Sequence, residues 1–182
     1  MEAHADIISV RVPPAPAAQG SRVGERIGSL LGALSPRRAG IASIDVVTDP
    51  GPAFYDITEA VQMHVHRSRV REGTALVSTM HTTCGVVINE SERLLFQDFT
   101  RFLNRLAPPC GEYEHDDMSR RVGVPPDEPR NGHAHCQHLL LSPTVVVPVS
   151  GGRLYLGRWQ SIILVELDQG RQRRITVHTT GH

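Results

Sequence analysis

Apolar and polar residues alternate along this chain with two different spacings, which predict strands in some segments and helices in others. Short runs rich in Val, Ile and Leu and bounded by Gly, Pro or Asp indicate strands. Such runs lie at residues 44–47, 75–78, 86–88, 145–149, 154–156, 161–167 and 175–177. Most of them are in the last third of the chain, so we expect the sheet to be built largely from that region.

Two longer segments have the spacing of an amphipathic helix. The first begins at Asp56 or Thr58, either of which is a suitable N-cap, and ends before Gly73. The second spans residues 91–106 and begins at the N-cap Ser91. Its apolar side chains recur every three or four residues, so they form a single stripe that can pack against a sheet.

A polar, proline-rich segment over residues 110–131 follows the second helix. A third helix is expected to begin within Asn131–His138 and to continue to Leu141. Loops of this length in a compact domain are usually functional or disordered. Many strands and few helices together indicate an α+β fold, in which the helices pack against a mixed and largely antiparallel sheet.

Residues 1–38 differ from the rest of the chain. The segment Val12–Ala18 contains three prolines, which lack the N–H group that helices and inner strands need. Residues 21–31 have a loose helical spacing, but two glycines interrupt it. We therefore predict a flexible N-terminal extension over residues 1–38 and one folded domain over residues 39–182.

The charge composition narrows the classes of partner and chemistry. With 19 basic and 19 acidic residues the formal net charge is zero, so neither a nucleic acid nor a membrane surface is expected as a partner. Every basic residue is an arginine, which excludes a lysine Schiff base. No run approaches the ~20 apolar residues of a membrane span. The three cysteines lack C-x-x-C spacing, and their odd number fits a reducing cytoplasm.

The densest group of reactive side chains surrounds one predicted strand. His81 and Thr82 precede this strand, and Glu90 follows it. Polar groups at both ends of a short apolar strand usually serve a site or a buried hydrogen-bond network. The partners that either role requires must come from other segments of the chain.

Five histidines are candidates for such partners, at positions 81, 115, 133, 135 and 138. A neutral imidazole binds zinc and other transition metals, and three histidines with an open coordination position are typical of a catalytic site. On a helix His135 and His138 share a face, whereas on a strand or loop His133 and His135 point to one side. Spacing alone leaves two interpretations open: a metal or catalytic site, or histidines that serve only the surface and hydrogen bonding.

The only tryptophan, Trp159, lies in a turn between Arg158 and Gln160. It is either a core aromatic or the wall of a pocket in which Gln160 contacts a ligand. Arg153 and Arg158 flank this turn, and a planar guanidinium can hold a phosphate through two hydrogen bonds. The alternative for both arginines is a solvated position on the surface.

In combination, these segments resemble the YjbQ family, which is also called the secondary thiamine-phosphate synthase family. The resemblance runs in order from about Ile41 to Val177. It rests on the segments Phe54-Tyr55-Asp56-Ile57-Thr58, His81-Thr82-Thr83 with Asn89-Glu90, Asp98, Tyr113-x-His115, Asn131-x-x-Ala134-His135, Pro148-Val149 and Gly157-x-Trp159-Gln160.

The resemblance implies a fold, an assembly and an activity. The fold is a compact α+β domain with a buckled mixed sheet, and the assembly is a homotrimer with polar pockets near the subunit contacts. The activity is a weak thiamine-phosphate synthase reaction, which joins a pyrimidine pyrophosphate to a thiazole phosphate. The resemblance carries over a polar set of His81, Thr82, Glu90, Asp98, His115, His135, Trp159 and Gln160.

The chain departs from the family pattern at three positions. His133 stands where the family commonly has an aspartate, Gln137 where a lysine is common, and Arg158 where a threonine is frequent. The first change either adds a metal ligand or removes a carboxylate. The other two alter the positive charge that is available to a phosphate.

We predict a small cytoplasmic enzyme that acts on a phosphorylated small molecule. His81, His115 and His135 are expected to bind a divalent metal, zinc or magnesium, or to act as acid and base groups. Glu90 and Asp98 are expected to orient these histidines. The residues expected to bind the substrate are Thr82, Arg153, Arg158, Trp159 and Gln160. The alternative is a non-catalytic homotrimer that binds a metal or a small ligand.

Overall fold

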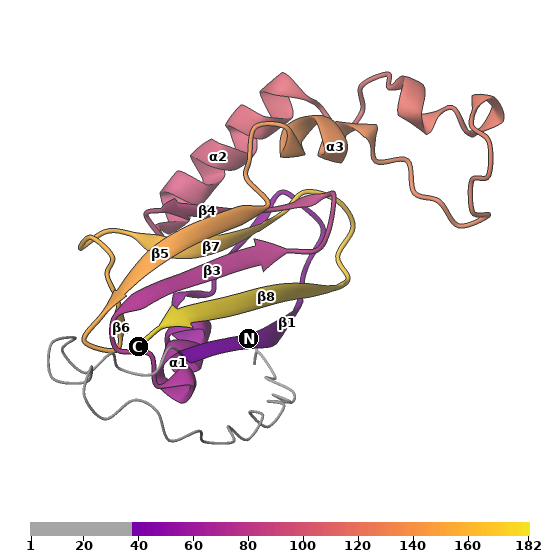
Figure 1. Ribbon diagram of the computed structural model, residues 1–182. Coiled ribbons are helices and arrows are strands. Elements are labelled where there is room, and N and C mark those ends of the chain that lie inside the picture. The colour runs from indigo at the N-terminus through magenta and orange to yellow at the C-terminus, as the bar shows by residue number, and fades with distance from the viewer. Residues whose placement is uncertain (1–37) are drawn as a thin grey trace, which may run out of the picture.

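Figure 1 shows the computed structural model of the protein, which describes residues 38–182. The strands form two sheets. The five-stranded sheet has the order β1 (Arg38–Val47), β8 (Gln172–Gly181), β3 (Gly73–Thr79), β5 (Thr144–Ser150) and β6 (Arg153–Leu154). The three-stranded sheet has the order β2 (Ala53–Asp56), β7 (Ser161–Glu166) and β4 (Cys84–Asn89). Of the N-terminal extension predicted over residues 1–38, all but Arg38 lies outside the described residues.

Helices complete the α+β fold that the sequence predicts. Residues 38–182 contain α1 (Thr58–Ser68), α2 (Arg93–Leu106) and α3 (Gly132–His138), with two short 3₁₀ helices, η1 (Glu114–Asp116) and η2 (Met118–Arg120). Every strand pairing in this part of the chain is antiparallel. The expected mixed and largely antiparallel sheet is thus a pair of antiparallel sheets. None of the described helices is long and apolar enough to cross a membrane.

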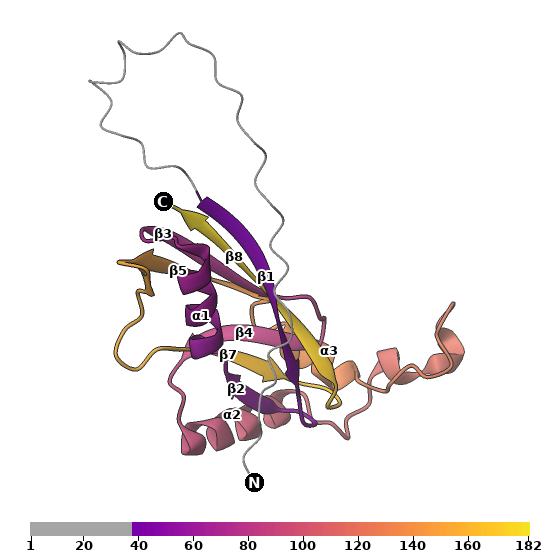
Figure 2. The same ribbon diagram turned by 90° about the horizontal axis from the view of Figure 1, so that it is seen from below.

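Strand β7 is buried on both faces and joins the two layers of the core. Ile162 and Leu164 point into a cluster between the sheets, which α1 completes with Val61 and Val65. The other face of β7 packs through Val165 against a second cluster that includes α2. Figure 1 shows α2 and α3 on one side of the three-stranded sheet, and Figure 2 shows α1 on the other side. This double burial explains why residues 162–165 are an uninterrupted apolar run.

The register of β4 with β7 defines two ends of the three-stranded sheet. Cys84 pairs with Glu166 at one end, and Asn89 pairs with Ser161 at the other. A six-residue strand is about 20 Å long at ~3.3 Å per residue. Groups that precede β4 and groups that follow it are therefore far apart within one chain.

The helix ends differ from those predicted. Helix α1 ends at Ser68 and not just before Gly73, because Arg69 already has a left-handed backbone with φ of 57°. At its start the N-cap residue is Ile57, although the Asp56 carboxylate accepts the N–H of Thr58. Helix α3 ends at His138, three residues before the predicted Leu141.

The side chain that caps α2 is also different from the predicted one. The Glu92 carboxylate accepts the N–H groups of Leu94 and Leu95, each at 2.8 Å. The prediction of Ser91 as the N-cap was therefore wrong by one residue. The carboxylate serves two helix N–H groups at once, and its negative charge also lies at the positive end of the helix dipole.

Candidate functional site

A polar cleft of about 440 Å³ opens at the end of the sheets where β3 leads to β4 and where β7 leads to β8. The segment of residues 107–131, here called the arm, closes one side of the cleft. Figure 1 shows the arm extending away from the sheets between α2 and α3. The lining residues are Met80, His81, Thr82, Thr83, His115, Arg121, Glu128, Pro129, Asn131, His135, Asp168, Arg171 and Arg173.

His81 is held in one orientation at the entry to β4. Its Nε2 accepts the backbone N–H of Arg174 at 2.9 Å, and the backbone N–H of His81 donates to Thr79 Oγ1 at 3.3 Å. Burial, followed by the positive charges of Arg173 and Arg171, lowers the pKa of His81 below its ordinary value of 6.5. The ring is therefore neutral at pH 7, and Nδ1 carries the proton as a hydrogen-bond donor.

The rings of His115 and His135 lie next to each other in the wall of the cleft. Their ring centroids are 4.7 Å apart, and the ring planes are inclined by 45°. Burial and then the nearby His115 lower the pKa of His135 below its ordinary value of 6.5. The charged form of His135 is thus disfavoured beside a second imidazole, so His135 is suited to accept or release a proton.

The arm is tied to α3 beside these two rings. Asp116 in η1 accepts the backbone N–H of Gly132 at 2.9 Å, and its carboxylate lies 3.4 Å from Nδ1 of His115. A Cβ atom at position 132 would lie 2.5 Å from Cβ of Tyr113. Only glycine therefore lets the arm approach α3 closely enough to bring His115 to His135.

The deepest charged group of the cleft is a buried ion pair. Nε and Nη2 of Arg173 donate to the two carboxylate oxygens of Glu166 at 2.5 and 2.6 Å, and Glu166 is fully buried. Burial raises the pKa of Glu166, but hydrogen bonds from Arg173, from the backbone N–H of Asp168 and from Thr48 outweigh this effect, and the pKa lies below its ordinary value. The pair fixes the floor of the cleft in an ionised state.

The other two arginines of the cleft also have carboxylate partners. Arg171 donates to Asp168 at 2.9 Å, and Arg121 donates to Glu128 at 2.9 Å. Arg171 still exposes 42% of its side chain, and this bond uses only its Nη2. Its remaining N–H groups can donate to a bound anion.

The histidines do not form a ready metal site. Among residues 38–182, no group of three or more His, Cys, Asp or Glu side chains is arranged to hold a metal ion. His81 already uses Nε2 to accept the N–H of Arg174. His81, His115 and His135 thus share a cleft without the geometry of a ligand set. The expected zinc or magnesium site stays a prediction.

The structure brings together four predicted site residues and separates the others from them. His81, Thr82, His115 and His135 all line the cleft. Glu90, Trp159 and Gln160 follow Asn89 and precede Ser161, so they lie at the opposite end of the three-stranded sheet.

The residues outside the cleft have local partners or face solvent. Trp159 is 63% exposed, and Cζ of Arg158 lies 4.7 Å from the centre of its ring. Oε1 of Gln160 accepts the N–H of Gly157 at 2.8 Å, which closes the turn. Trp159 is thus neither a core aromatic nor a wall of the cleft within one chain.

Asp98 and Arg153 are also remote from the cleft. Asp98 is an exposed residue of α2 that pairs with Arg101 one turn later. Arg153 lies in β6, the edge strand of the five-stranded sheet. Their predicted roles, like those of Glu90 and Arg158, stay predictions.

Seven polar lining residues were not among the predicted site residues: Thr83, Arg121, Glu128, Asn131, Asp168, Arg171 and Arg173. One signal in the sequence does point to part of this group. Glu166 lies within the run of residues 161–167 that was predicted to be a strand, between Val165 and Leu167, and a carboxylate that becomes buried there requires a cationic partner. The choice of Arg173 as that partner depends on the turn between β7 and β8, which the sequence pattern does not define.

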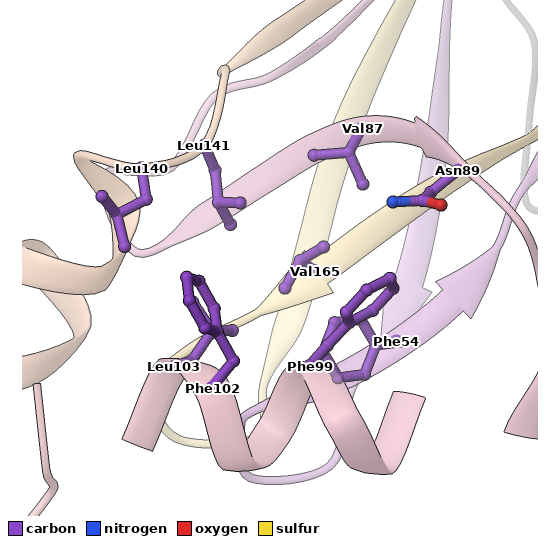
Figure 3. Close-up of a pocket in the computed structure, with 9 residues that line it drawn as sticks. All are labelled: Phe54, Val87, Asn89, Phe99, Phe102, Leu103, Leu140, Leu141 and Val165. Carbon is purple, nitrogen blue, oxygen red and sulfur yellow. The ribbon is translucent and has the colours of Figure 1, made fainter. Parts of the chain in front are cut away.

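A second hollow, of about 160 Å³, lies between α2 and the three-stranded sheet. Figure 3 shows Phe99, Phe102 and Leu103 of α2 opposite Val87 and Val165. Asn89 is its only polar lining residue, and no predicted catalytic or substrate-binding residue lines it. The polar cleft is therefore the better candidate for chemistry.

The fold and the cleft together define an α+β protein that combines histidine and arginine side chains in one polar site. The chain belongs to the YjbQ family, because the family described as "UPF0047 protein YjbQ-like" matches residues 42–182. This match confirms the family to which the sequence motifs pointed.

Known relatives support this membership. A UPF0047 protein of Archaeoglobus fulgidus is 41% identical over 122 residues, which cover 67% of this chain and 86% of the relative. A crystal structure of a YbjQ-like protein of unknown function from Sulfolobus solfataricus P2 has a TM-score of 0.72 at 31% identity, covering 81% of this chain and all of the other. A hypothetical protein from Aeropyrum pernix K1 has a TM-score of 0.69 at 31% identity, covering 78% and 98% of the two chains.

Proposed function

We propose that this protein is a cytoplasmic enzyme that acts on a phosphorylated small molecule in the polar cleft. The observation that carries the proposal is the convergence of three histidines from three separate segments with the side chains of Arg171 and Arg121. His115 and His135 supply a group that exchanges a proton, and the arginines supply hydrogen bonds to an anion.

The specific reaction we propose is thiamine-phosphate synthesis. A carbon–oxygen bond of the pyrimidine pyrophosphate breaks, the pyrophosphate leaves, and the same carbon bonds to the thiazole nitrogen. The barrier then depends on stabilising the leaving pyrophosphate and on holding the thiazole in line. Arg171, Nδ1–H of His81 and the Thr82 hydroxyl are donors that can stabilise this leaving group.

A turnover assay tests this proposal. Purified protein is incubated with hydroxymethylpyrimidine pyrophosphate and thiazole phosphate, with or without Mg²⁺, Mn²⁺ or Zn²⁺, and thiamine phosphate is quantified. We expect product from the wild type and a loss of at least about tenfold in His135→Ala, since acid–base groups contribute ~10²–10⁴-fold. The control is His66→Ala, a change of an exposed histidine on α1. The absence of product under every condition would contradict the proposal.

A non-catalytic binding protein is the second candidate, and one observation favours it. Each arginine of the cleft already has a carboxylate partner, so a leaving anion finds no unpaired permanent charge there. This candidate predicts a saturable complex with a metal or a small ligand, without turnover. Loss of that binding in His135→Ala, with no activity in the wild type, distinguishes it from the enzyme.

We also propose that the protein assembles as a homotrimer. Glu90, Trp159 and Gln160 are separated from the cleft by the length of β4, about 20 Å. A second copy can bring these groups near the cleft where one chain does not. This assembly preserves the expectation that both sets of residues serve one site.

A further inference from the structure

Asn131 occupies a helix N-cap but does not cap the helix. Asparagine is favoured at this position because its Oδ1 usually accepts an N–H of the first turn. In this chain the Asn131 side chain makes no such bond to α3. The N–H of Gly132 instead donates to Asp116 of the arm at 2.9 Å. The Asn131 amide is therefore available for another role.

The amide is turned toward the β7–β8 connection. Nδ2 of Asn131 donates to Oδ2 of Asp168 at 2.8 Å, and the same oxygen accepts Nη2 of Arg171 at 2.9 Å. An ionised carboxylate only accepts hydrogen bonds, so the amide must present its NH₂ group to Asp168. This contact determines the direction of Oδ1.

Oδ1 of Asn131 is a buried acceptor without a donor. The residue is 5% exposed, and its Oδ1 has no hydrogen-bond partner in the part of the chain that the structure describes. A buried acceptor that lacks a donor is unfavourable, and most are satisfied by protein, water or ligand. Asn131 also lines the cleft, where its backbone carbonyl accepts the N–H of His135 and its Nδ2 donates to Asp168.

We propose that Oδ1 of Asn131 accepts a hydrogen bond from a hydroxyl or amino group of the molecule that binds in the cleft. The ligand class is then a phosphorylated compound that also carries a hydrogen-bond donor. Asn131 distinguishes it from a phosphate ester without a donor, because binding the latter leaves Oδ1 unpaired. This inference rests on the proposed phosphate binding and adds the second group that the cleft recognises.

Two matched pairs of small esters test the inference by calorimetric titration. The pairs are 2-hydroxyethyl phosphate with ethyl phosphate, and 3-hydroxypropyl phosphate with propyl phosphate; inorganic phosphate reports the anion alone. In the wild type we expect the hydroxylated member of at least one pair to bind about tenfold more tightly. Asn131→Ser should reduce this ratio to about one. Serine suits an N-cap but is too short to replace the amide, so the helix is retained.

The ratio of the two affinities in a pair distinguishes a recognition role of Asn131 from a structural one. A general disturbance of the cleft weakens the binding of both esters equally and leaves this ratio unchanged. Asn131→Ala provides a second variant if Asn131→Ser does not fold. The inference is overturned if neither pair shows a preference in the wild type, or if the variant keeps the preference. Failure of inorganic phosphate and of every ester to bind the wild type would instead overturn the proposed function itself, and this inference with it.

Discussion

The ion pair between Glu166 and Arg173 forms the floor of the cleft and is expected to stabilise the folded protein. Both side chains are almost fully buried, at 0% and 3% exposure. Removing one charge of a buried pair leaves the other without compensation, which typically costs 3–5 kcal/mol. We expect Glu166→Gln to lower the free energy of unfolding in urea by about 3 kcal/mol.

The matched control is a second ion pair on β8. Arg174 is adjacent in the sequence to Arg173 but points to the outer face of the sheet, where it pairs with Asp45. Solvent screens such exposed pairs, so Asp45→Asn should lower stability far less than Glu166→Gln. Equal losses of unfolding free energy in the two variants would show that the buried pair stabilises the protein no more than the exposed pair.

The same pair gives stability a defined dependence on pH. The pKa of Glu166 in the folded protein lies below its ordinary value of 4.5, so unfolding takes up a proton at intermediate pH. The stabilisation by this carboxylate is therefore complete well above pH 4.5 and is lost as the pH falls through the lowered pKa. In urea titrations the difference between wild type and Glu166→Gln should shrink as the pH decreases below 4.5.

At the scale of single elements, the start of α2 depends on one carboxylate. Glu92 accepts two helix N–H groups, whereas neighbouring Glu90 uses its side chain for no hydrogen bond within residues 38–182. We expect Glu92→Ala to lower the melting temperature and Glu90→Ala to leave it nearly unchanged. If the two variants melt alike, the capping role of Glu92 is wrong.

Most elements could be predicted from the sequence because their local pattern is strong. The run at residues 161–167 has the length and composition of a buried strand, and it forms β7 at Ser161–Glu166. Helix ends were less predictable. Arg69 takes the left-handed conformation that usually favours glycine, so no residue marked the end of α1 at Ser68.

The cleft could be predicted only in part. His81, His115 and His135 were identified through reactive side chains and family motifs, and they meet in one site. Arg171 and Asp168 were missed because they lie in a turn without a motif. Their place beside Asn131 depends on how the β7–β8 connection meets α3, which is tertiary information.

At the scale of the whole molecule, the outer face of the five-stranded sheet carries exposed apolar residues that can contact further copies of the chain. His178 pairs with Ile41 on one side and with Leu76 on the other, and Leu76 also pairs with Val146. The apolar side chains of Ile41, Leu76 and Val146 therefore lie in one row across this face. Ile41 and Val146 are 63% and 55% exposed in the single chain. Contact with further copies would remove this apolar surface from water.

Analytical ultracentrifugation tests the proposed homotrimer. We expect a mass three times the 20.0 kDa of the chain. Val146→Glu should shift the protein toward smaller species, because it places a charge in the apolar row. The control is Val122→Glu in the arm, at a fully exposed position, which should leave the mass unchanged. A wild-type mass of one chain would contradict the trimer.

An NMR titration with inorganic phosphate tests whether the cleft binds a phosphorylated molecule through its histidines and arginines. The imidazole signals are assigned by single histidine variants. We expect the signals of His81, His115 and His135 to shift together and saturate, while those of His64 and His66 on α1 stay in place. The absence of a saturable shift at the three cleft histidines, or equal shifts on α1, would contradict such binding.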